Sequence, residues 1–155
     1  RYTFPEIVFT ERGLRDDEDV PRRVNNSVLD GQRNDIEIWR CRGIISDTPV
    51  YQAYLAQANA LKEKYKDCLM LGTYNDVLGF TCSNSAVDAR SFLGKDRMAI
   101  VAANQNTDCA RTLTASFKVP GYHFVEAGTT GGAVVKNGKI KLGQYDLAVL
   151  IYEKD

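Results

Sequence analysis

The sequence has one histidine, four cysteines and no excess of either charge. Its 155 residues include 20 lysines and arginines and 20 aspartates and glutamates, so the formal net charge is zero. A basic excess, the electrostatic signature of a nucleic-acid-binding protein, is missing. No apolar run approaches the roughly 20 residues that a membrane-spanning helix needs. We therefore expect neither a nucleic acid nor a membrane as a partner.

The cysteines and the histidine do not form a metal-binding pattern. No two of the four cysteines form a CxxC pair; they are Cys41, Cys68, Cys82 and Cys109. The histidine, His123, is distant from all of them in sequence. Zinc sites usually show cysteine pairs two to four residues apart. We expect no metal and no cofactor, and we expect the cysteines to be buried hydrophobic side chains. The cellular compartment stays open.

The first 66 residues predict alternating strands and helices. The apolar run at 7–10 is typical of a buried parallel strand, and Pro21 is expected to open a helix that ends before Gly31. Residues 35–41 alternate as a second strand, and residues 48–66 predict a second helix. This order is typical of βα units in a parallel sheet. Two such units cannot close a barrel, which normally needs eight.

The helix at residues 48–66 has the clearest pattern in the chain. Thr48 suits its N-cap and Pro49 its first position, where no amide donor is needed. We expect one face to pack against the second strand, at residues 36–39. That face is formed by apolar and aromatic side chains that recur at helical spacing: Tyr51, Tyr54, Leu55, Ala58, Leu61 and Tyr65.

After residue 68 the pattern changes to short strands and turns. Residues 69–73 and 77–82 predict two strands around a turn at 74–76. Residues 87–92 and 98–103 predict a hairpin. Seven or eight such strands indicate an antiparallel β-sandwich.

Two features of the C-terminal half are the most specific. The dipeptide Asn137-Gly138 between apolar runs is the strongest hairpin signal in the sequence. Residues 147–152 are apolar on both faces and predict a central strand. We therefore divide the chain into a βα region at 1–68 and a sandwich at 69–155.

The runs FPEIVFTERGLRDDEDVPRR, NALKEKYKDCLMLGTYNDVLGF and LAVLIYEK together resemble the C-terminal region of bacterial glycoside hydrolase-like proteins. In such proteins a (β/α)8 TIM barrel precedes a β-sandwich. The resemblance implies an α/β remnant, the last βα units of a barrel, followed by an antiparallel all-β sandwich. It also implies that this chain is the C-terminal piece of a larger carbohydrate-active hydrolase. We expect the carbohydrate to bind through an upstream barrel and the isolated chain to be inactive.

Barrel active sites lie at the C-terminal ends of the strands. Glu11 and Arg12 would lie at the end of the first predicted strand and Arg40 near the end of the second. Glycoside hydrolysis usually needs two carboxyl groups, about 5 Å or 6.5–9.5 Å apart. Glu11 is the first catalytic candidate, Asp16 and Asp17 are alternatives, and the arginines are candidates for substrate binding. The competing interpretation is a salt-bridged strand end followed by a solvated acidic loop.

Aromatic side chains are the other candidates for sugar binding. Trp39 is the candidate at the barrel mouth, and Tyr122 and Tyr145 are those of the sandwich, although core packing explains most aromatic residues. His123 is expected to be an exposed strand residue. The alternative function is a non-catalytic carbohydrate-binding or protein-interaction module. Self-association, or packing on an upstream segment, is a further possibility.

Overall fold

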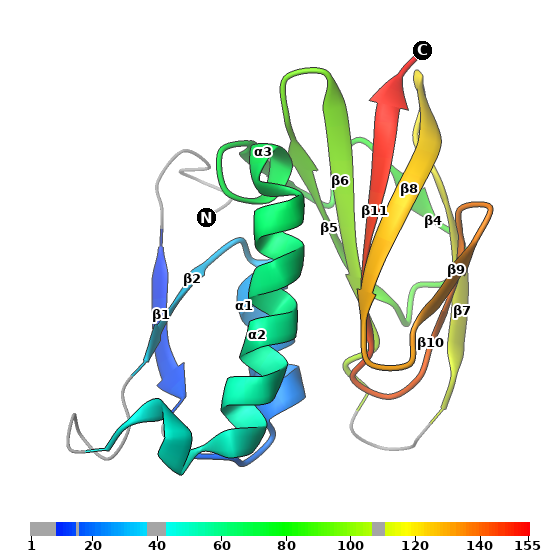
Figure 1. The fold of residues 1–155 in the computed structure, drawn as a ribbon. Coiled ribbons are helices and arrows are strands. Elements are labelled where there is room, and N and C mark those ends of the chain that lie inside the picture. Colours follow the sequence, from blue (N-terminus) through cyan, green and yellow to red (C-terminus); the bar gives the residue numbers. More distant parts are fainter. Residues whose placement is uncertain (1–8, 15, 37–42, 107–110) are drawn as a thin grey trace.

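A small parallel sheet, a layer of helices and a β-sandwich succeed one another across the protein (Figure 1). The computed structural model describes residues 9–14, 16–36, 43–106 and 111–155. In the described part, no helix is both long and apolar enough to cross a membrane.

The first layer belongs to a βαβ unit. Strand β1 (Thr10–Leu14) pairs in parallel with β2 (Arg33–Ile36), and α1 (Val20–Leu29) connects them. Pro21 lies in the first turn of α1, and Gly31, at φ 61°, follows its end as expected. Of the apolar run at 7–10 that predicts the first strand, Thr10 belongs to β1, the Phe9 carbonyl accepts a hydrogen bond from the Arg33 amide at 2.8 Å, and residues 7 and 8 lie outside the described part.

The predicted second helix is confirmed, with a break near its end. A short 3₁₀ turn, η1 (Ile45–Asp47), leads into α2 (Pro49–Lys64), and α3 (Lys66–Leu69) follows after Tyr65 leaves the helical conformation. Helix α3 spans the boundary predicted between residues 68 and 69, and the division into two domains stays a prediction.

The predicted antiparallel sandwich is confirmed by two sheets. Five strands follow the order β3-β5-β6-β11-β8, and four follow the order β4-β7-β10-β9. Every pairing in these two sheets is antiparallel. The strands are β3 (Thr73–Asp76), β4 (Thr81–Cys82), β5 (Asp88–Leu93), β6 (Arg97–Ala103), β7 (Leu113–Lys118), β8 (Tyr122–Thr130), β9 (Val134–Lys136), β10 (Lys139–Leu142) and β11 (Leu147–Lys154).

One predicted turn is displaced along the chain. Residues 74–76 belong to β3, where Tyr74 lies opposite Phe92 of β5, and the turn lies slightly later, at 75–78, where the Leu78 amide donates to the carbonyl of Asn75 at 3.1 Å. The reversal follows β3, where Asp76 and Gly79 have φ values of 53° and 80°. The next strand, β4, joins the other sheet, and the two predicted strands are therefore not a hairpin. The Asn137-Gly138 hairpin between β9 and β10 is confirmed.

Strand β11 has two buried faces because a layer covers each side of its sheet. Val149 and Ile151 belong to the cluster that includes the helices, whereas Leu150 and Tyr152 belong to the cluster between the two sheets. This alternation explains why residues 147–152 are apolar throughout.

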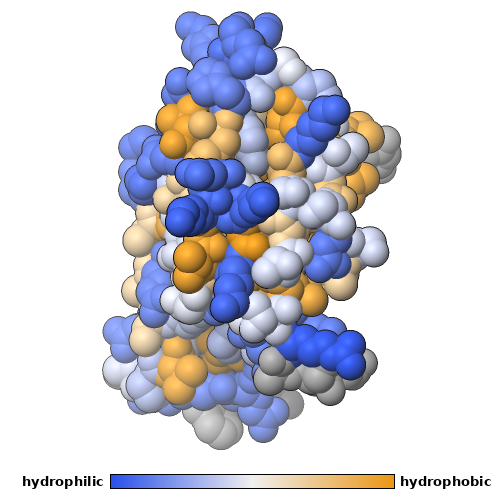
Figure 2. All heavy atoms as spheres, turned by 90° about the vertical axis from the view of Figure 1, so that its right-hand side faces the viewer, coloured by the Kyte–Doolittle hydropathy of each residue, from blue (hydrophilic) through white to orange (hydrophobic). Residues whose placement is uncertain are grey.

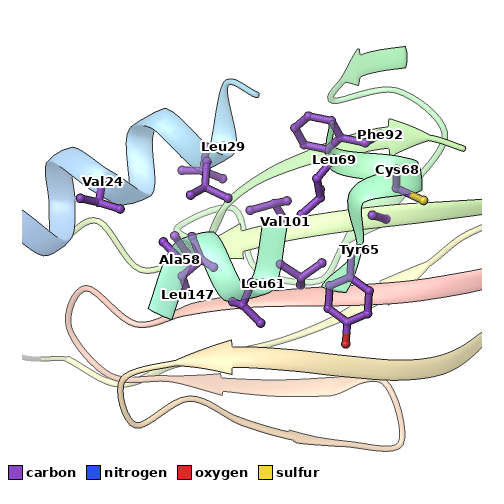
Figure 3. Packing of buried hydrophobic residues seen from close by; sticks show 14 of the residues in the cluster. Val24, Leu29, Ala58, Leu61, Tyr65, Cys68, Leu69, Phe92, Val101 and Leu147 are labelled. Atoms are coloured by element: carbon purple, nitrogen blue, oxygen red, sulfur yellow. The ribbon is translucent and has the colours of Figure 1, made fainter. Parts of the chain in front are cut away.

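The apolar face of α2 packs on α1 and on the five-stranded sheet (Figure 3). Leu61 and Tyr65 lie over β8, where Gly128 permits a close approach: a β-carbon there would lie 2.6 Å from Leu61 Cδ2. We had expected this face to contact residues 36–39, whose side chains lie outside the described part. In the described part, the helices therefore cover the face of the five-stranded sheet that points away from the four-stranded sheet.

Candidate functional site

The acidic loop after β1 is held by contacts to both helices. The Asp17 carboxylate accepts hydrogen bonds from the backbone amides of Tyr51, at 2.9 Å, and Val50, at 3.3 Å. These amides belong to the first turn of α2, where donors lack partners within the helix and the dipole favours a negative charge. Asp17 thus caps α2, a role expected of Thr48, whose hydroxyl donates instead to the carbonyl of Ile45.

Asp16 is held by α1. Its carboxylate accepts hydrogen bonds from Arg23 Nη1, at 3.0 Å, and from the Glu18 amide, at 3.1 Å. The side chains of this ion pair are partly exposed, so its contribution to stability is at most about 1 kcal/mol. These contacts give the loop a structural role, and catalysis by Asp16 or Asp17 stays a prediction.

The other predicted site residues lie at the first layer or outside the described residues. Glu11 and Arg12 lie within β1, where Glu11 is opposite Asn34 of β2, and not after the end of the strand as expected. Trp39 and Arg40 lie outside the described part. The side chains of Glu11 and Arg12 also lie outside the described part, and the predicted roles of these residues stay predictions.

A pocket at one end of the sandwich offers a different site. It lies between the turn that joins β7 to β8 and the Asn137-Gly138 turn of the β9–β10 hairpin, with a volume of about 510 Å³. We call it the hairpin pocket. Its lining combines aromatic, hydroxyl and charged side chains: Ser116, Phe117, Lys118, Tyr122, Phe124, Asn137, Lys139, Tyr152 and Asp155, together with residues 119–121 and Gly138.

Behind the wall of the hairpin pocket, Tyr152 carries a buried hydroxyl that has no protein partner in the described part. Its side chain is buried, and its hydroxyl has no hydrogen-bond partner among the described residues. Burial raises the pKa of Tyr152 to about 12, so the hydroxyl stays protonated at neutral pH. Its ring packs edge-on against Phe124, with centroids 5.7 Å apart. The hydroxyl lies beside Gly138, where a β-carbon would be 3.9 Å away.

The three sandwich residues singled out in the sequence have different surroundings. Tyr122 lines the hairpin pocket, as a sugar-binding residue would. His123 is exposed, as expected, and its Nδ1 lies 3.1 Å from Asp155 Oδ1. Tyr145 lies elsewhere, at the junction with the helices, with φ 58°.

That junction contains a buried hydrogen-bond network. The Tyr54 hydroxyl lies 2.8 Å from Asn25 Oδ1 and 2.9 Å from Thr130 Oγ1. The carbonyl of Tyr145 accepts hydrogen bonds from Asn25 Nδ2, at 2.8 Å, and from the Tyr54 hydroxyl, at 3.2 Å. Asn25 belongs to α1, Tyr54 to α2 and Thr130 to β8, so the network joins both helices to the sandwich. Burial raises the pKa of Tyr54.

A second pocket, beside the β5–β6 turn, is lined in part by an ion pair. Arg97 binds Asp67 through two hydrogen bonds, of 2.6 Å from Nε and 2.8 Å from Nη2. These bonds lower the pKa of Asp67. Beside them, burial raises the pKa of Cys68 to about 11, so this thiol is not an activated nucleophile. Cys68 and Cys82 are free, and in the described part no three His, Cys, Asp or Glu side chains form a group that could hold a metal.

Comparison with known proteins supports the fold. No protein-family model and no curated protein matches the chain. Among solved structures, a glycoside hydrolase family 30 subfamily 8 xylanase from Clostridium acetobutylicum is similar over 94% of this chain and 42% of its own, with a TM-score of 0.51 and 12% identity. An endoxylanase of the same family from Clostridium papyrosolvens is similar over 94% of this chain and 41% of its own, with a TM-score of 0.47 and 16% identity.

The chain therefore spans less than half the length of either xylanase. At 12% identity, the likeness to the first one shows a shared fold. Sequence reasoning did not single out Tyr152 as a residue of the pocket because residues 147–152 looked uniformly apolar. The available signal was the tyrosine itself, whose buried hydroxyl needs a partner that an apolar strand does not provide.

Proposed function

We propose that this chain is the C-terminal region of a glycoside hydrolase-like protein, in which the sandwich supports the end of a (β/α)8 barrel. The observation that supports the proposal most directly is the parallel βαβ unit whose helix α1, with α2, shares a core with the five-stranded sheet. The likeness to a family 30 xylanase over 94% of the chain supports the same arrangement.

The sandwich would act here as a rigid support. Core side chains from α1 and α2 pack directly on the five-stranded sheet, and the Tyr54 network adds buried hydrogen bonds across the same contact. Such a support would hold the last barrel helices in place and, through them, the strand ends that carry catalytic groups. Hydrolysis itself would need a second carboxylate from the rest of the barrel.

The test is an assay of the complete gene product against xylan, glucan and mannan, with release of reducing ends as the readout. We expect hydrolysis of at least one polysaccharide by the gene product and none by the 155-residue chain. If Glu11 is a catalytic acid or base, Glu11→Gln should lower kcat by about 10²–10⁴-fold, whereas Arg33→Gln, on the neighbouring strand, should not. A folded gene product that is inactive on all substrates would contradict the proposal.

The second candidate function is a non-catalytic glycan-binding module. The hairpin pocket favours it, because the aromatic side chains of Tyr122 and Phe124 and the hydroxyl of Ser116 lie in one lining. Aromatic faces and hydroxyl donors are the groups that would contact a sugar ring. Tyr122→Ala should then weaken glycan binding by the 155-residue chain, measured by calorimetry. Unchanged binding would remove the pocket from this role.

A further inference from the structure

The outer face of the four-stranded sheet carries a group of lysines. Lys118 of β7, Lys136 of β9 and Lys139 and Lys141 of β10 are all exposed, and they alternate with side chains that point into the sandwich. We call this surface the lysine face. Figure 2 looks onto this side of the molecule, where strongly hydrophilic side chains gather in the middle of the face.

The lysines of this face have no acidic side chain beside them on their own strands. The strands β4, β7, β9 and β10 contain no acidic residue, and none of the four lysines forms an ion pair with a described residue. Asp155 is the one carboxylate of the adjoining hairpin pocket among the described residues, where it shares the lining with Lys118 and Lys139, and its Oδ1 lies 3.1 Å from His123 Nδ1. By contrast, Lys64 and Lys66 on the helical side are paired with glutamates.

The register also places two positive charges directly opposite each other. Lys136 of β9 lies opposite Lys139 of β10. Like charges at facing positions of adjacent strands destabilise a sheet. In a chain with zero formal net charge, this concentration is a local feature and not a consequence of composition. An anionic ligand would relieve the repulsion.

Hydroxyl groups lie between the lysines. Thr114 is opposite Lys141 and Ser116 is opposite Lys139. Together with Ser83 they line a shallow groove of about 400 Å³ that also includes Lys136. Ser116 and Lys139 line the hairpin pocket as well, so the groove and the pocket form one continuous surface.

We propose that the lysine face binds an acidic polysaccharide, with lysines pairing to its carboxylates and the serine and threonine side chains to its hydroxyls. This ligand class rests on the proposed membership of the chain in a carbohydrate-active protein. The serine and threonine hydroxyls between the lysines match the hydroxyls of a polysaccharide, and binding of DNA is one of the outcomes of the test. The hairpin pocket, with Tyr122 and Phe124, would receive a sugar ring at one end of the groove.

The test is binding of polygalacturonate to the 155-residue chain by titration calorimetry and by electrophoresis in gels that contain the polymer. An uncharged galactan is the control ligand. The face variant is Lys136→Gln/Lys139→Gln/Lys141→Gln. Its control, Lys66→Gln/Lys95→Gln/Lys154→Gln, removes the same number of charges from exposed positions on other elements.

We expect polygalacturonate to bind more tightly than galactan and its affinity to fall as salt is added. The face variant should lose about tenfold or more in affinity, as expected for three exposed charge contacts. The control variant should change less than about twofold. The far-ultraviolet spectrum and melting temperature of each variant would verify its fold.

Three results would overturn the proposal: no binding of polygalacturonate at low ionic strength, equal losses in the two variants, or equally tight binding of DNA or polyglutamate, which would indicate an unspecific polyanion surface. The measurement is independent of catalysis. An inactive gene product would leave this binding intact, and absent binding would leave hydrolysis intact, so the two proposals can fail separately.

Discussion

Replacing Tyr54 with phenylalanine tests the connection between the helices and the sandwich. The change removes one oxygen atom and leaves the ring in place. That oxygen lies 2.8 Å from Asn25 Oδ1 and 2.9 Å from Thr130 Oγ1. Asn25 and Thr130 are buried, at 0% and 2% exposure, so water cannot readily replace the lost partner.

The expected cost follows from what the phenylalanine leaves behind. A buried polar group that loses its partner costs about 1–3 kcal/mol, more than the net value of the hydrogen bond. Asn25 Oδ1 would lose its donor, while Asn25 Nδ2 would keep its bond to the carbonyl of Tyr145. We therefore expect Tyr54→Phe to lower the free energy of unfolding by about 1–3 kcal/mol.

Urea unfolding followed by far-ultraviolet circular dichroism measures this change. Tyr145→Phe is the matched control, because it removes a hydroxyl that forms no hydrogen bond with a described residue and keeps the carbonyl that the network uses. We expect the control to change stability by less than about 0.5 kcal/mol. A double-mutant cycle with Asn25→Ala should give a coupling of about 0.5–3 kcal/mol. If both phenylalanine variants unfold alike and the coupling is zero, the network does not join the layers.

Four further predictions concern single positions. Gly128→Ala should cost about 1–3 kcal/mol in urea unfolding, because its β-carbon would meet Leu61; a neutral effect would mean that α2 can shift. Tyr152→Phe should raise stability by up to about 1 kcal/mol, because it removes an unpaired buried hydroxyl. The same variant should lose less stability above pH 10.0. Burial raises the pKa of Tyr152 from 10.0 to about 12 in the folded protein, so its contribution to stability is complete below pH 10.0 and falls as the pH rises toward 12. Equal losses of melting temperature at alkaline pH in both proteins would contradict this. Asp67→Asn should reduce the fall in melting temperature at acid pH. The lowered pKa of Asp67 gives stability that is present above pH 3.8 and is lost as the pH falls through the pKa of the folded protein. An unchanged dependence of the melting temperature on acid pH would count against the ion pair. Lys136→Gln should raise the free energy of unfolding by about 0.2–1 kcal/mol, because it relieves the repulsion with Lys139 across the hairpin. A lower melting temperature would argue against that repulsion.

Local chemistry predicted much of the fold. The Asn137-Gly138 turn, the doubly apolar run at 147–152 and the helix at 48–66 each depend on short-range rules of turn geometry and periodicity. These elements are found as β9–β10, β11 and α2–α3. The alternation of strand and helix before residue 66 was likewise sufficient to predict the βα order.

What the sequence could not show depends on residues brought together by the fold. Asp17 caps a helix that begins 32 residues later, and no local pattern indicates such a contact. The turn predicted at 74–76 lies slightly later, at 75–78, because pairing of β3 with β5 outweighs local turn preference. The hairpin pocket and the lysine face are each formed by side chains from several strands. The sequence of each strand alone looks like that of an ordinary strand with one solvent-exposed face.

The central claim is that the βα unit and the sandwich are held together by one shared core. Native-state hydrogen exchange of the 155-residue chain, read by mass spectrometry, tests it directly. We predict that peptides from α2 and from β11, which share a core, exchange through openings of the same free energy and respond equally to urea. If α2 exchanges through a much easier opening while β11 stays protected, the helical layer is only loosely attached and the account is contradicted.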